Sequence, residues 1–241
     1  MAGTVAIFGV GTPDGVGGAL TRRFAAENHH VLVAGRTLEK VQETADAINS
    51  AGGSAEAVRV DVTSEADQDE IFAHISKLGT LDAVICNAGL NSPIKFEDLS
   101  SAEFESFWRV NCYGAFLTSQ RAVKIMVPQR SGSLLFTGAS ASLRGKPGFA
   151  HFASAKAALR NLVQALAREY GPQGIHVGHV VIDGAVNGDN VRGRFGEYLE
   201  MLGEDGSLNP DAIADAFMTL HMQSRSAWTH ELDLRPFKEN W

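Results

Sequence analysis

A cluster of glycines follows the first apolar run of the chain and directly precedes a helical pattern. The run Thr4–Phe8 ends at the first of these glycines, and an amphipathic segment begins within the cluster. Glycine lets a diphosphate approach the backbone N–H groups, and a helix N-terminus adds partial positive charge there. A tight turn alone could also require glycines. The position between strand and helix favours dinucleotide binding, with Gly9, Gly11, Thr12, Gly15, Val16 and Gly17 as candidate contacts.

The second apolar run ends in a cation where an NAD-binding site of this type usually carries an acid. Val31–Ala34 is followed by Gly35 and Arg36. An acid would accept a hydrogen bond from the ribose 2′-hydroxyl, whereas a guanidinium can hold a 2′-phosphate through two hydrogen bonds. Arg36 could also be a solvated side chain at a strand end. The sequence therefore favours NADP as the cofactor, with NAD as the alternative.

Four further motifs follow along the chain in a fixed order. They are Asp61-Val62 after the third apolar run, Asn87-Ala88-Gly89 after the fourth, Asn111 within a long helical pattern, and Lys156 in Ser-Ala-Lys-Ala-Ala-Leu. In this order and spacing, together with the glycine cluster, they resemble the motifs of the short-chain dehydrogenase/reductase family. The resemblance covers nearly the whole chain.

The resemblance implies a role for each motif. Asp61 and Val62 would contact the adenine, and Asn87, Ala88 and Gly89 would support the central sheet beside the cofactor. Asn111 would be the family's structural and catalytic asparagine. Lys156 would hold the nicotinamide ribose and lower the pKa of a catalytic tyrosine. Gly184 and Val186 keep the family spacing after the sixth apolar run, where the backbone of Val186 would meet the nicotinamide carboxamide.

The chain departs from the family pattern at the residues that move protons. The family's tyrosine precedes the lysine by one helical turn on the same face, and here that residue is Phe152. A phenyl ring can neither donate nor accept a proton. The commonest position of the family's serine holds Ala139, so the adjacent Ser140 is the candidate to act in its place. The catalytic positions implied are thus Asn111, Ser140, Phe152 and Lys156.

A second departure lies at the end of the sixth apolar run. Asp183 stands where the family usually has proline, so it could reorganise the crevice or simply cap the turn.

Short apolar runs alternate with longer amphipathic segments, which is typical of βαβ units around a parallel sheet buried on both faces. The expected strands are Thr4–Phe8, Val31–Ala34, Ala55–Val60, Leu81–Cys86, Ser133–Thr137, His176–Ile182 and Thr229–Leu234. The expected helices are Val16–Asn28, Leu38–Ala51, Glu65–Leu78, Ala102–Arg130, Phe149–Gly171 and Pro210–Met222. This order predicts an α/β fold: a Rossmann-like, doubly wound parallel sheet with helices on both faces and the ligand crevice at the carboxyl ends of the strands.

No linker or composition shift divides the chain, so residues 1–241 are expected to form a single domain. The Gly-rich, charged segment 187–209 follows directly after a strand, which makes it a candidate lid over the substrate.

Composition narrows the possible partners. Hydrophobic residues make up 44% of the chain and charged residues 20%, with a net charge of -7, which is typical of a globular protein and gives no basic patch for nucleic acid. No apolar run is long enough to span a membrane, and the start of the chain does not resemble a signal peptide. The two cysteines are too few for a disulfide framework. We therefore expect a cytoplasmic protein that binds neither nucleic acid nor membranes.

No metal site is predicted, because His176 and His179 are three residues apart on an expected strand and point to opposite faces.

Two functions are compatible with these residues. The first is an NAD(P)-dependent oxidoreductase acting on a small, apolar carbonyl, imine or activated alkene, with the proton supplied by a group other than tyrosine. The second is a catalytically inactive protein that binds NADP(H) as a sensor or scaffold. The retained Lys156 favours the enzyme, although a lysine that binds ribose would also be kept for binding alone. The family resemblance further implies a homodimer or homotetramer.

Overall fold

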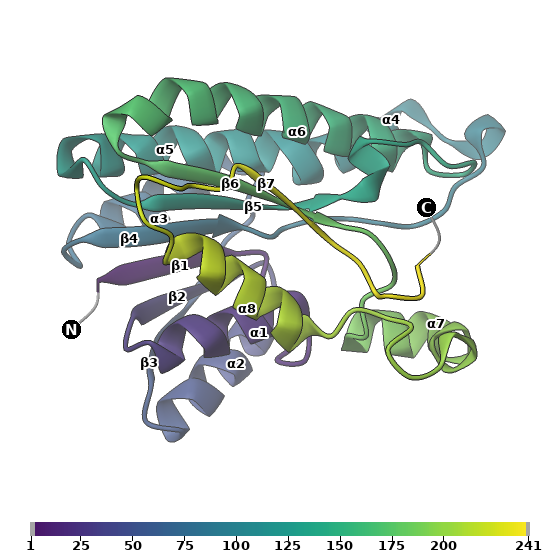
Figure 1. The fold of residues 1–241 in the computed structure, drawn as a ribbon, viewed down its shortest axis with the longest axis horizontal. Coiled ribbons are helices and arrows are strands. Elements are labelled where there is room, and N and C mark those ends of the chain that lie inside the picture. Colours follow the sequence, from purple (N-terminus) through teal and green to yellow (C-terminus); the bar gives the residue numbers. More distant parts are fainter. Residues whose placement is uncertain (1–2, 240–241) are drawn as a thin grey trace.

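The computed structural model describes residues 3–239, which contain seven strands in one parallel sheet of order β3-β2-β1-β4-β5-β6-β7 (Figure 1). The strands are β1 (Thr4–Phe8), β2 (His30–Gly35), β3 (Ser54–Arg59), β4 (Leu81–Cys86), β5 (Ser133–Ala139), β6 (His176–Ile182) and β7 (Glu231–Leu234). The predicted doubly wound Rossmann-like fold is therefore confirmed. Because β1 pairs with both β2 and β4, the strand order reverses beside it, and a ligand crevice is expected at that point.

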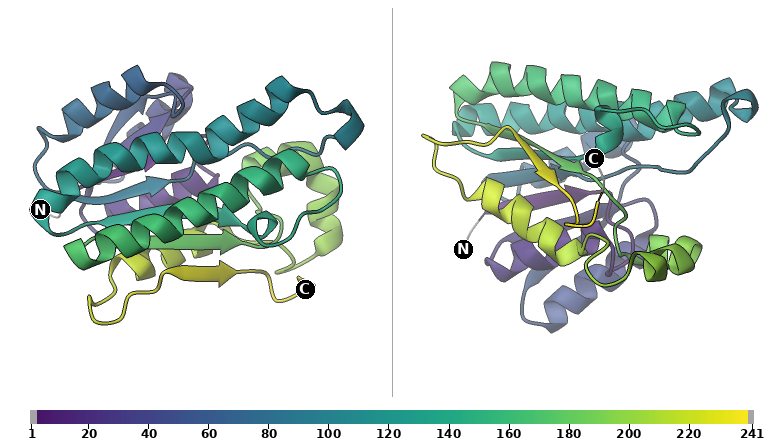
Figure 2. Two further views of the ribbon diagram at one scale, coloured as in Figure 1. Left: turned by 90° about the horizontal axis from the view of Figure 1, so that it is seen from above. Right: turned by 45° about the vertical axis from the view of Figure 1, so that its right-hand side comes forward.

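Helices cover both faces of the sheet. One face carries α1 (Val16–Ala26), α2 (Leu38–Ser50) and α8 (Pro210–His221), and the other carries α3 (Glu65–Ile75), α4 (Ser101–Trp108), α5 (Gly114–Gln129) and α6 (Ala150–Tyr170). Figure 2 shows α3, α5 and α6 side by side over their face. The remaining α-helix, α7 (Asp189–Leu202), lies apart from these layers near the start of α1.

Each central strand is apolar on both sides because both of its faces are buried. In β1, Val5 and Ile7 pack into the core under α1, α2 and α8, whereas Ala6 and Phe8 pack into the core under α3, α5 and α6. Successive side chains of a strand point to opposite faces, so two separate cores need an uninterrupted apolar run. This explains why the strands were predictable as short apolar runs.

The helix expected over Ala102–Arg130 is interrupted, which corrects that prediction. A π-helical turn, Arg109–Tyr113, separates α4 from α5. Within it, the Asn111 side chain donates a hydrogen bond of 3.0 Å to the carbonyl oxygen of Phe107. In a regular α-helix that carbonyl would accept the backbone N–H of Asn111, so the side chain competes with the helical hydrogen-bond ladder. Such turns often occur at functional sites.

Three histidines on the sheet and its flanking helix are largely buried, and burial is the main cause that lowers the pKa of each below 6.5. They are His176, His179 and His221. Below pH 6.5 the unfolded chain therefore binds more protons than the folded chain, so the free energy of unfolding falls as the pH drops. We expect a lower urea midpoint at pH 5.5 than at pH 7.5, because the loss of stability sets in as the pH falls through about 6.5.

The His179 ring makes the sharpest test of this expectation. It is fully buried, and its Nδ1 hydrogen-bonds Glu231 at 3.0 Å. Substituting His179→Gln keeps a hydrogen-bonding side chain but removes the titration, so the difference between the two midpoints should shrink. The control is His30→Gln, because the His30 side chain is 33% exposed. An equal difference in wild type and His179→Gln would contradict the assignment.

No helix within residues 3–239 is both long and apolar enough to cross a membrane.

Candidate functional site

The glycine cluster forms a turn between β1 and α1 that is packed on one side and open on the other. Gly9 has φ +92°, and a Cβ there would lie 2.2 Å from the backbone nitrogen of Ala88. A Cβ on Gly17 would lie 2.8 Å from Cα of Val10. In contrast, a Cβ on Gly11 would have nothing within 4 Å. The open side leaves backbone exposed ahead of the α1 N-terminus at Val16. We call the turn formed by residues 9–17 the cradle, and its open side fits a diphosphate.

Asn87 ties the cradle to the central strands. Its Nδ2 donates to the carbonyl oxygen of Gly9 at 2.9 Å, and its Oδ1 accepts from Thr137 Oγ1 at 2.9 Å. These contacts join the carboxyl ends of β1, β4 and β5. Two residues later, a Cβ on Gly89 would lie 3.1 Å from Asn111 Oδ1 and 3.7 Å from Lys156 Nζ. The structure thus brings the Asn87-Ala88-Gly89 motif, Asn111 and Lys156 together.

Lys156 is 5% exposed, and its Nζ donates a hydrogen bond of 2.8 Å to the carbonyl oxygen of Thr137. Burial lowers the pKa of Lys156 to about 8. Burial also raises the pKa of Cys86, a neighbouring thiol, to about 12, so that thiol is neutral at pH 7 and does not compensate the charge. An ammonium group has three donors, so Nζ can hold a further acceptor in the crevice.

Asn111 uses its side chain to fix the backbone of the crevice. Its Oδ1 accepts from the Leu90 N–H at 3.3 Å, and its Nδ2 donates to the Leu90 carbonyl at 3.1 Å as well as to Phe107. The side chain is 1% exposed. It therefore ties the backbone that follows Gly89 to the π-helical turn Arg109–Tyr113.

The far end of the crevice is formed by the ends of β2 and β3. Arg36 follows β2 and is exposed. Asp61 follows β3, and its Oδ1 accepts from the N–H and the hydroxyl of Thr63 at 2.9 and 2.8 Å. Val62 is 7% exposed, and a Cβ on Gly114 would lie 2.8 Å from it. The carboxylate of Asp61 thus shapes the turn that places Val62.

A family model for short chain dehydrogenases matches residues 5–195, which include the cradle, Asn111 and Lys156. The chain belongs to the short-chain dehydrogenase family.

Two individual family members resemble this chain over most of its length. The chain is 34% identical over 221 residues to the uncharacterized oxidoreductase YuxG of Bacillus subtilis, a match that covers 90% of this chain but only 31% of that relative's length. A crystal structure of a short-chain dehydrogenase from Rhodopseudomonas palustris is 32% identical, with a TM-score of 0.84 and coverage of 98% of this chain and 99% of that chain.

A third neighbour was solved with a cofactor. It is a candidate NAD(P)-dependent gluconate 5-dehydrogenase from Beutenbergia cavernae with NADP bound at low occupancy. It is 25% identical, with a TM-score of 0.86, and the match covers 98% of this chain and 96% of that chain.

In the present chain, Phe152 and Ser140 lie on two elements that pack against each other. Phe152 lies on α6 one turn before Lys156, is 8% exposed, and has its ring centroid 5.9 Å from Lys156 Nζ. Ser140 opens a 3-10 turn, Ser140–Ser142, that follows β5 and packs against α6. The side chain beside the lysine is therefore a buried, apolar ring.

Asp183 does more than cap a turn. Its backbone N–H donates to the Leu234 carbonyl at 2.8 Å, a bond that a proline could not make, so the β6–β7 ladder continues by one residue. Its carboxylate is 3% exposed and pairs with Arg144 at 2.7 Å. Since Arg144 N–H also donates to the Ser140 carbonyl, the ion pair fastens the Ser140 turn to the end of β6. Sequence reasoning missed Arg144, because no motif marks it.

Gly184 and Val186 lie in the extended segment that follows β6. Gly184 has φ +135°, and a Cβ there would lie 2.9 Å from Pro236, so glycine is needed for the close approach of the C-terminal segment. Val186 forms a parallel bridge with Leu208. The Asn187 N–H also donates to the Leu208 carbonyl at 2.8 Å, so the start and the end of segment 187–209 are joined.

His151 has a packing role. Its ring is fully buried, its Nε2 hydrogen-bonds the Ser92 carbonyl at 3.0 Å, and its centroid lies 4.2 Å from that of Phe107. Within residues 3–239 no group of three or more His, Cys, Asp or Glu residues is placed to hold a metal ion.

Proposed function

We propose that this chain is an NADP-preferring oxidoreductase that works without the family's tyrosine. The observation that carries the proposal is the buried Lys156, whose amine is held at the carboxyl edge of the sheet by Thr137 and bordered by Gly89. Burying an amine is costly, so a lysine at this place favours a role in the site. When bound, the cofactor supplies the hydride, and the residues of the chain supply orientation and electrostatics.

Three groups of residues fit a nicotinamide dinucleotide. The cradle of Gly11 and Gly15 would receive the diphosphate, Asp61 and Val62 would border the adenine, and Lys156 would bind the nicotinamide ribose. The Beutenbergia cavernae relative, whose structure contains NADP at low occupancy, supports a nicotinamide dinucleotide as the ligand.

Arg36 is the basis for preferring NADP over NAD. Substituting Arg36→Ala should weaken NADPH binding by about tenfold, because a charge-assisted, two-point contact to the 2′-phosphate is lost, and should leave NADH binding almost unchanged. The measurement is a fluorescence titration with each cofactor.

The matched control for Arg36 is Arg59→Ala. Arg59 stands at the end of the neighbouring strand, where its Nη1 already donates to Asp67 at 2.9 Å. We expect this variant to bind both cofactors as the wild type does. Equal losses of NADPH and NADH affinity in Arg36→Ala would contradict a contact between Arg36 and the 2′-phosphate.

Phe152 takes the place of the family's tyrosine in this proposal, so the proton must come from elsewhere. Reduction of a polarised carbon–carbon or carbon–nitrogen double bond can take its proton from water, from a cofactor-ribose relay or from another side chain. Reduction of a carbonyl would instead use a water molecule held between Ser140 and Lys156. In both routes the substrate gains a hydride at carbon and a proton at the second atom of the double bond, so the charges balance.

A small, apolar substrate suits the aromatic side chains near the crevice. Phe149 caps the start of α6, Phe152 lies beside Lys156, and Phe195 on α7 is 45% exposed. The lid segment 187–209 would bring Phe195 to the substrate when it closes.

The alternative is an inactive NADP(H)-binding sensor or scaffold. The buried phenyl ring of Phe152 beside Lys156 favours it, because the binding residues are then present without the usual acid.

A homodimer or homotetramer is supported by an aromatic stripe across the junction of α4 and α5. Phe104, Trp108 and Phe116 are 41, 39 and 39% exposed, and Trp108, Tyr113 and Phe116 stack in sequence with centroid distances of 5.7 and 6.0 Å. Exposed aromatic clusters are typical of protein interfaces. Light scattering of the purified protein tests this assembly.

The experiment that tests the function has two steps. NADPH and NADH are first titrated against the protein by fluorescence, and a panel of ketones, imines and activated alkenes is then added while the cofactor absorbance is followed. Turnover of any class supports the oxidoreductase and identifies the proton route. Tight binding without turnover across the panel supports the sensor or scaffold, and absence of binding overturns both.

A further inference from the structure

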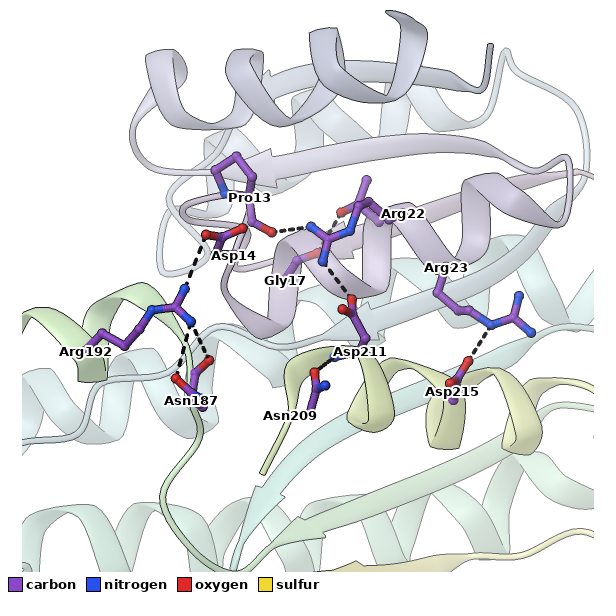
Figure 3. A network of polar contacts seen from close by, with 11 residues as sticks. Pro13, Asp14, Gly17, Arg22, Arg23, Asn187, Arg192, Asn209, Asp211 and Asp215 are labelled. Carbon is purple, nitrogen blue, oxygen red and sulfur yellow. Dashed lines mark hydrogen bonds and ion pairs between the residues drawn. The ribbon is translucent and has the colours of Figure 1, made fainter. Parts of the chain in front are cut away.

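The amino end of α7 lies directly against the cradle. A Cβ on Gly188, the residue before α7, would lie 3.3 Å from the Asp14 carbonyl oxygen and 3.5 Å from Cα of Gly15. Gly188 is buried in this contact. Figure 3 shows this junction, with α7 on one side of the cradle and α8 on the other. Two segments more than 170 residues apart therefore meet at the mouth of the diphosphate site.

Arg192 reaches across this junction from the first turn of α7. Its Nη2 pairs with Asp14 Oδ2 at 3.2 Å, and its Nη1 donates to the carbonyl and side-chain oxygens of Asn187 at 3.2 and 3.3 Å (Figure 3). Its Nη2 also pairs with Asp189 Oδ1 at 2.7 Å. The side chain is 45% exposed. The hydrogen bond from Arg192 is also the main cause that lowers the pKa of Asp189.

Asp14 places a negative charge at a site that would bind a negatively charged diphosphate. It lies between Gly11 and Gly15, its side chain is 64% exposed, and its charge would repel an incoming phosphate. The nearby cations on α1 have other partners: Arg22 donates to the Pro13 carbonyl and pairs with Asp211 at 2.7 Å, and Arg23 pairs with Asp215 at 2.7 Å (Figure 3). The cation that faces Asp14 is Arg192.

We propose that Arg192 is a ligand of the cofactor diphosphate, delivered to the cradle by α7, and that Asp14 holds its guanidinium there before the cofactor binds. This inference rests on the proposed function. An exposed ion pair contributes little, so a phosphate oxygen, which a guanidinium contacts in the same fork geometry, can displace the Asp14 carboxylate at small cost. The displaced carboxylate turns to solvent.

The local backbone of α7 permits this exchange. Phe195 interrupts the helix with φ -141° and ψ 38°, just after the turn that carries Arg192. Gly193 and Gly196 flank this break in open space, where a Cβ would have nothing within 4 Å. The first turn of α7 can thus adjust to the cofactor while the rest of the helix keeps its place.

Calorimetric titration with NADPH tests the proposal without measuring turnover. Arg192→Gln should weaken NADPH binding by about tenfold, because one charge-assisted contact to the diphosphate is lost. Asp14→Asn should act in the opposite direction and tighten binding by about threefold, because it removes a negative charge from the mouth of the cradle. Both residues are exposed, so neither substitution should disturb folding.

Two controls isolate the diphosphate. Arg194→Gln removes a cation from the same turn of α7, and the Arg194 guanidinium lies over the Phe195 ring at 5.5 Å, so its loss should not alter NADPH affinity. Adenosine 2′-phosphate carries the adenine and the 2′-phosphate but no diphosphate. Its affinity, measured by competition against NADPH, should be the same for wild type and Arg192→Gln.

Failure of the inference and failure of the proposed function give different results. Wild type that binds NADPH tightly, with Arg192→Gln unchanged or with an equal loss for adenosine 2′-phosphate, overturns the role of Arg192 and leaves the proposed function standing. Wild type that binds no nicotinamide cofactor overturns both.

Discussion

Substituting Lys156→Ala is expected to abolish turnover and to weaken NADPH binding by about tenfold or more. The amine is the buried donor of the crevice, and alanine leaves neither a charge nor a hydrogen-bond donor beside Gly89. Turnover is measured from the change in cofactor absorbance, and NADPH binding is measured by fluorescence titration. Lys156→Met keeps the apolar stem of the side chain, so it separates loss of the amine from loss of packing. The control is Lys124→Ala on the exposed side of α5, which should behave as wild type.

The same variants test the protonation state of the buried amine. The pKa of Lys156 falls from 10.5 in the unfolded chain to about 8 in the folded chain. Between these values the unfolded chain binds more protons, so the free energy of unfolding rises with pH across this window, and it is level below about pH 8, where both states carry the proton. Lys156→Met should remove this rise. Unchanged turnover in Lys156→Ala, or an unchanged pH profile in Lys156→Met, would contradict the assigned role.

Substituting Phe152→Tyr is expected to create or raise carbonyl reduction by about a hundredfold or more, the range that a positioned acid contributes. The new phenol would lie one turn from Lys156, in a place where the present ring is 5.9 Å from Nζ. The nearby amine would lower the pKa of that phenol and so help it to exchange a proton with the substrate. The measurement is the rate of NADPH oxidation with a panel of ketones and aldehydes. The affinity of the variant for NADPH should equal that of the wild type.

Phe116→Tyr is the matched control for this gain. It adds the same hydroxyl to a ring on α5 that is 39% exposed, away from Lys156, so it should leave carbonyl reduction unchanged. A gain in Phe152→Tyr alone means that the native crevice is an intact scaffold without its usual acid. No gain, with folding and NADPH affinity retained, would mean that the crevice does not hold a carbonyl next to position 152.

The central strands were predictable because each of them, such as β1 and β4, is an apolar run buried between two cores. The bounds of β1, β4 and β6 agree with the expected runs to the residue, and the other strands begin or end within two residues of them. The break between α4 and α5 was not predictable from periodicity. It depends on one side-chain contact, from Asn111 to Phe107, that leaves no glycine or proline signal in the sequence.

Part of the site could likewise be found from the sequence. The glycines, Asn87 and Lys156 carry motifs at fixed spacing, and the structure gathers them at one edge of the sheet. The partners of Asp183 and Arg192 carry no such signal. Arg144 is 39 residues from Asp183, and Asp14 is 178 residues from Arg192, so only the folded chain brings these charges together.

If a descendant of this protein no longer bound a cofactor, the glycines of the cradle would not all be conserved to the same degree. Gly9 and Gly17 are required by the sheet and the helix themselves, because any Cβ would collide with Ala88 or Val10. They would persist in a descendant that binds nothing. A Cβ on Gly11 would have nothing within 4 Å, so only a ligand gives a reason to keep glycine there. Substitution of Gly11 in a descendant would therefore indicate the loss of dinucleotide binding, whereas retention of Gly9 and Gly17 would indicate only that the fold is kept.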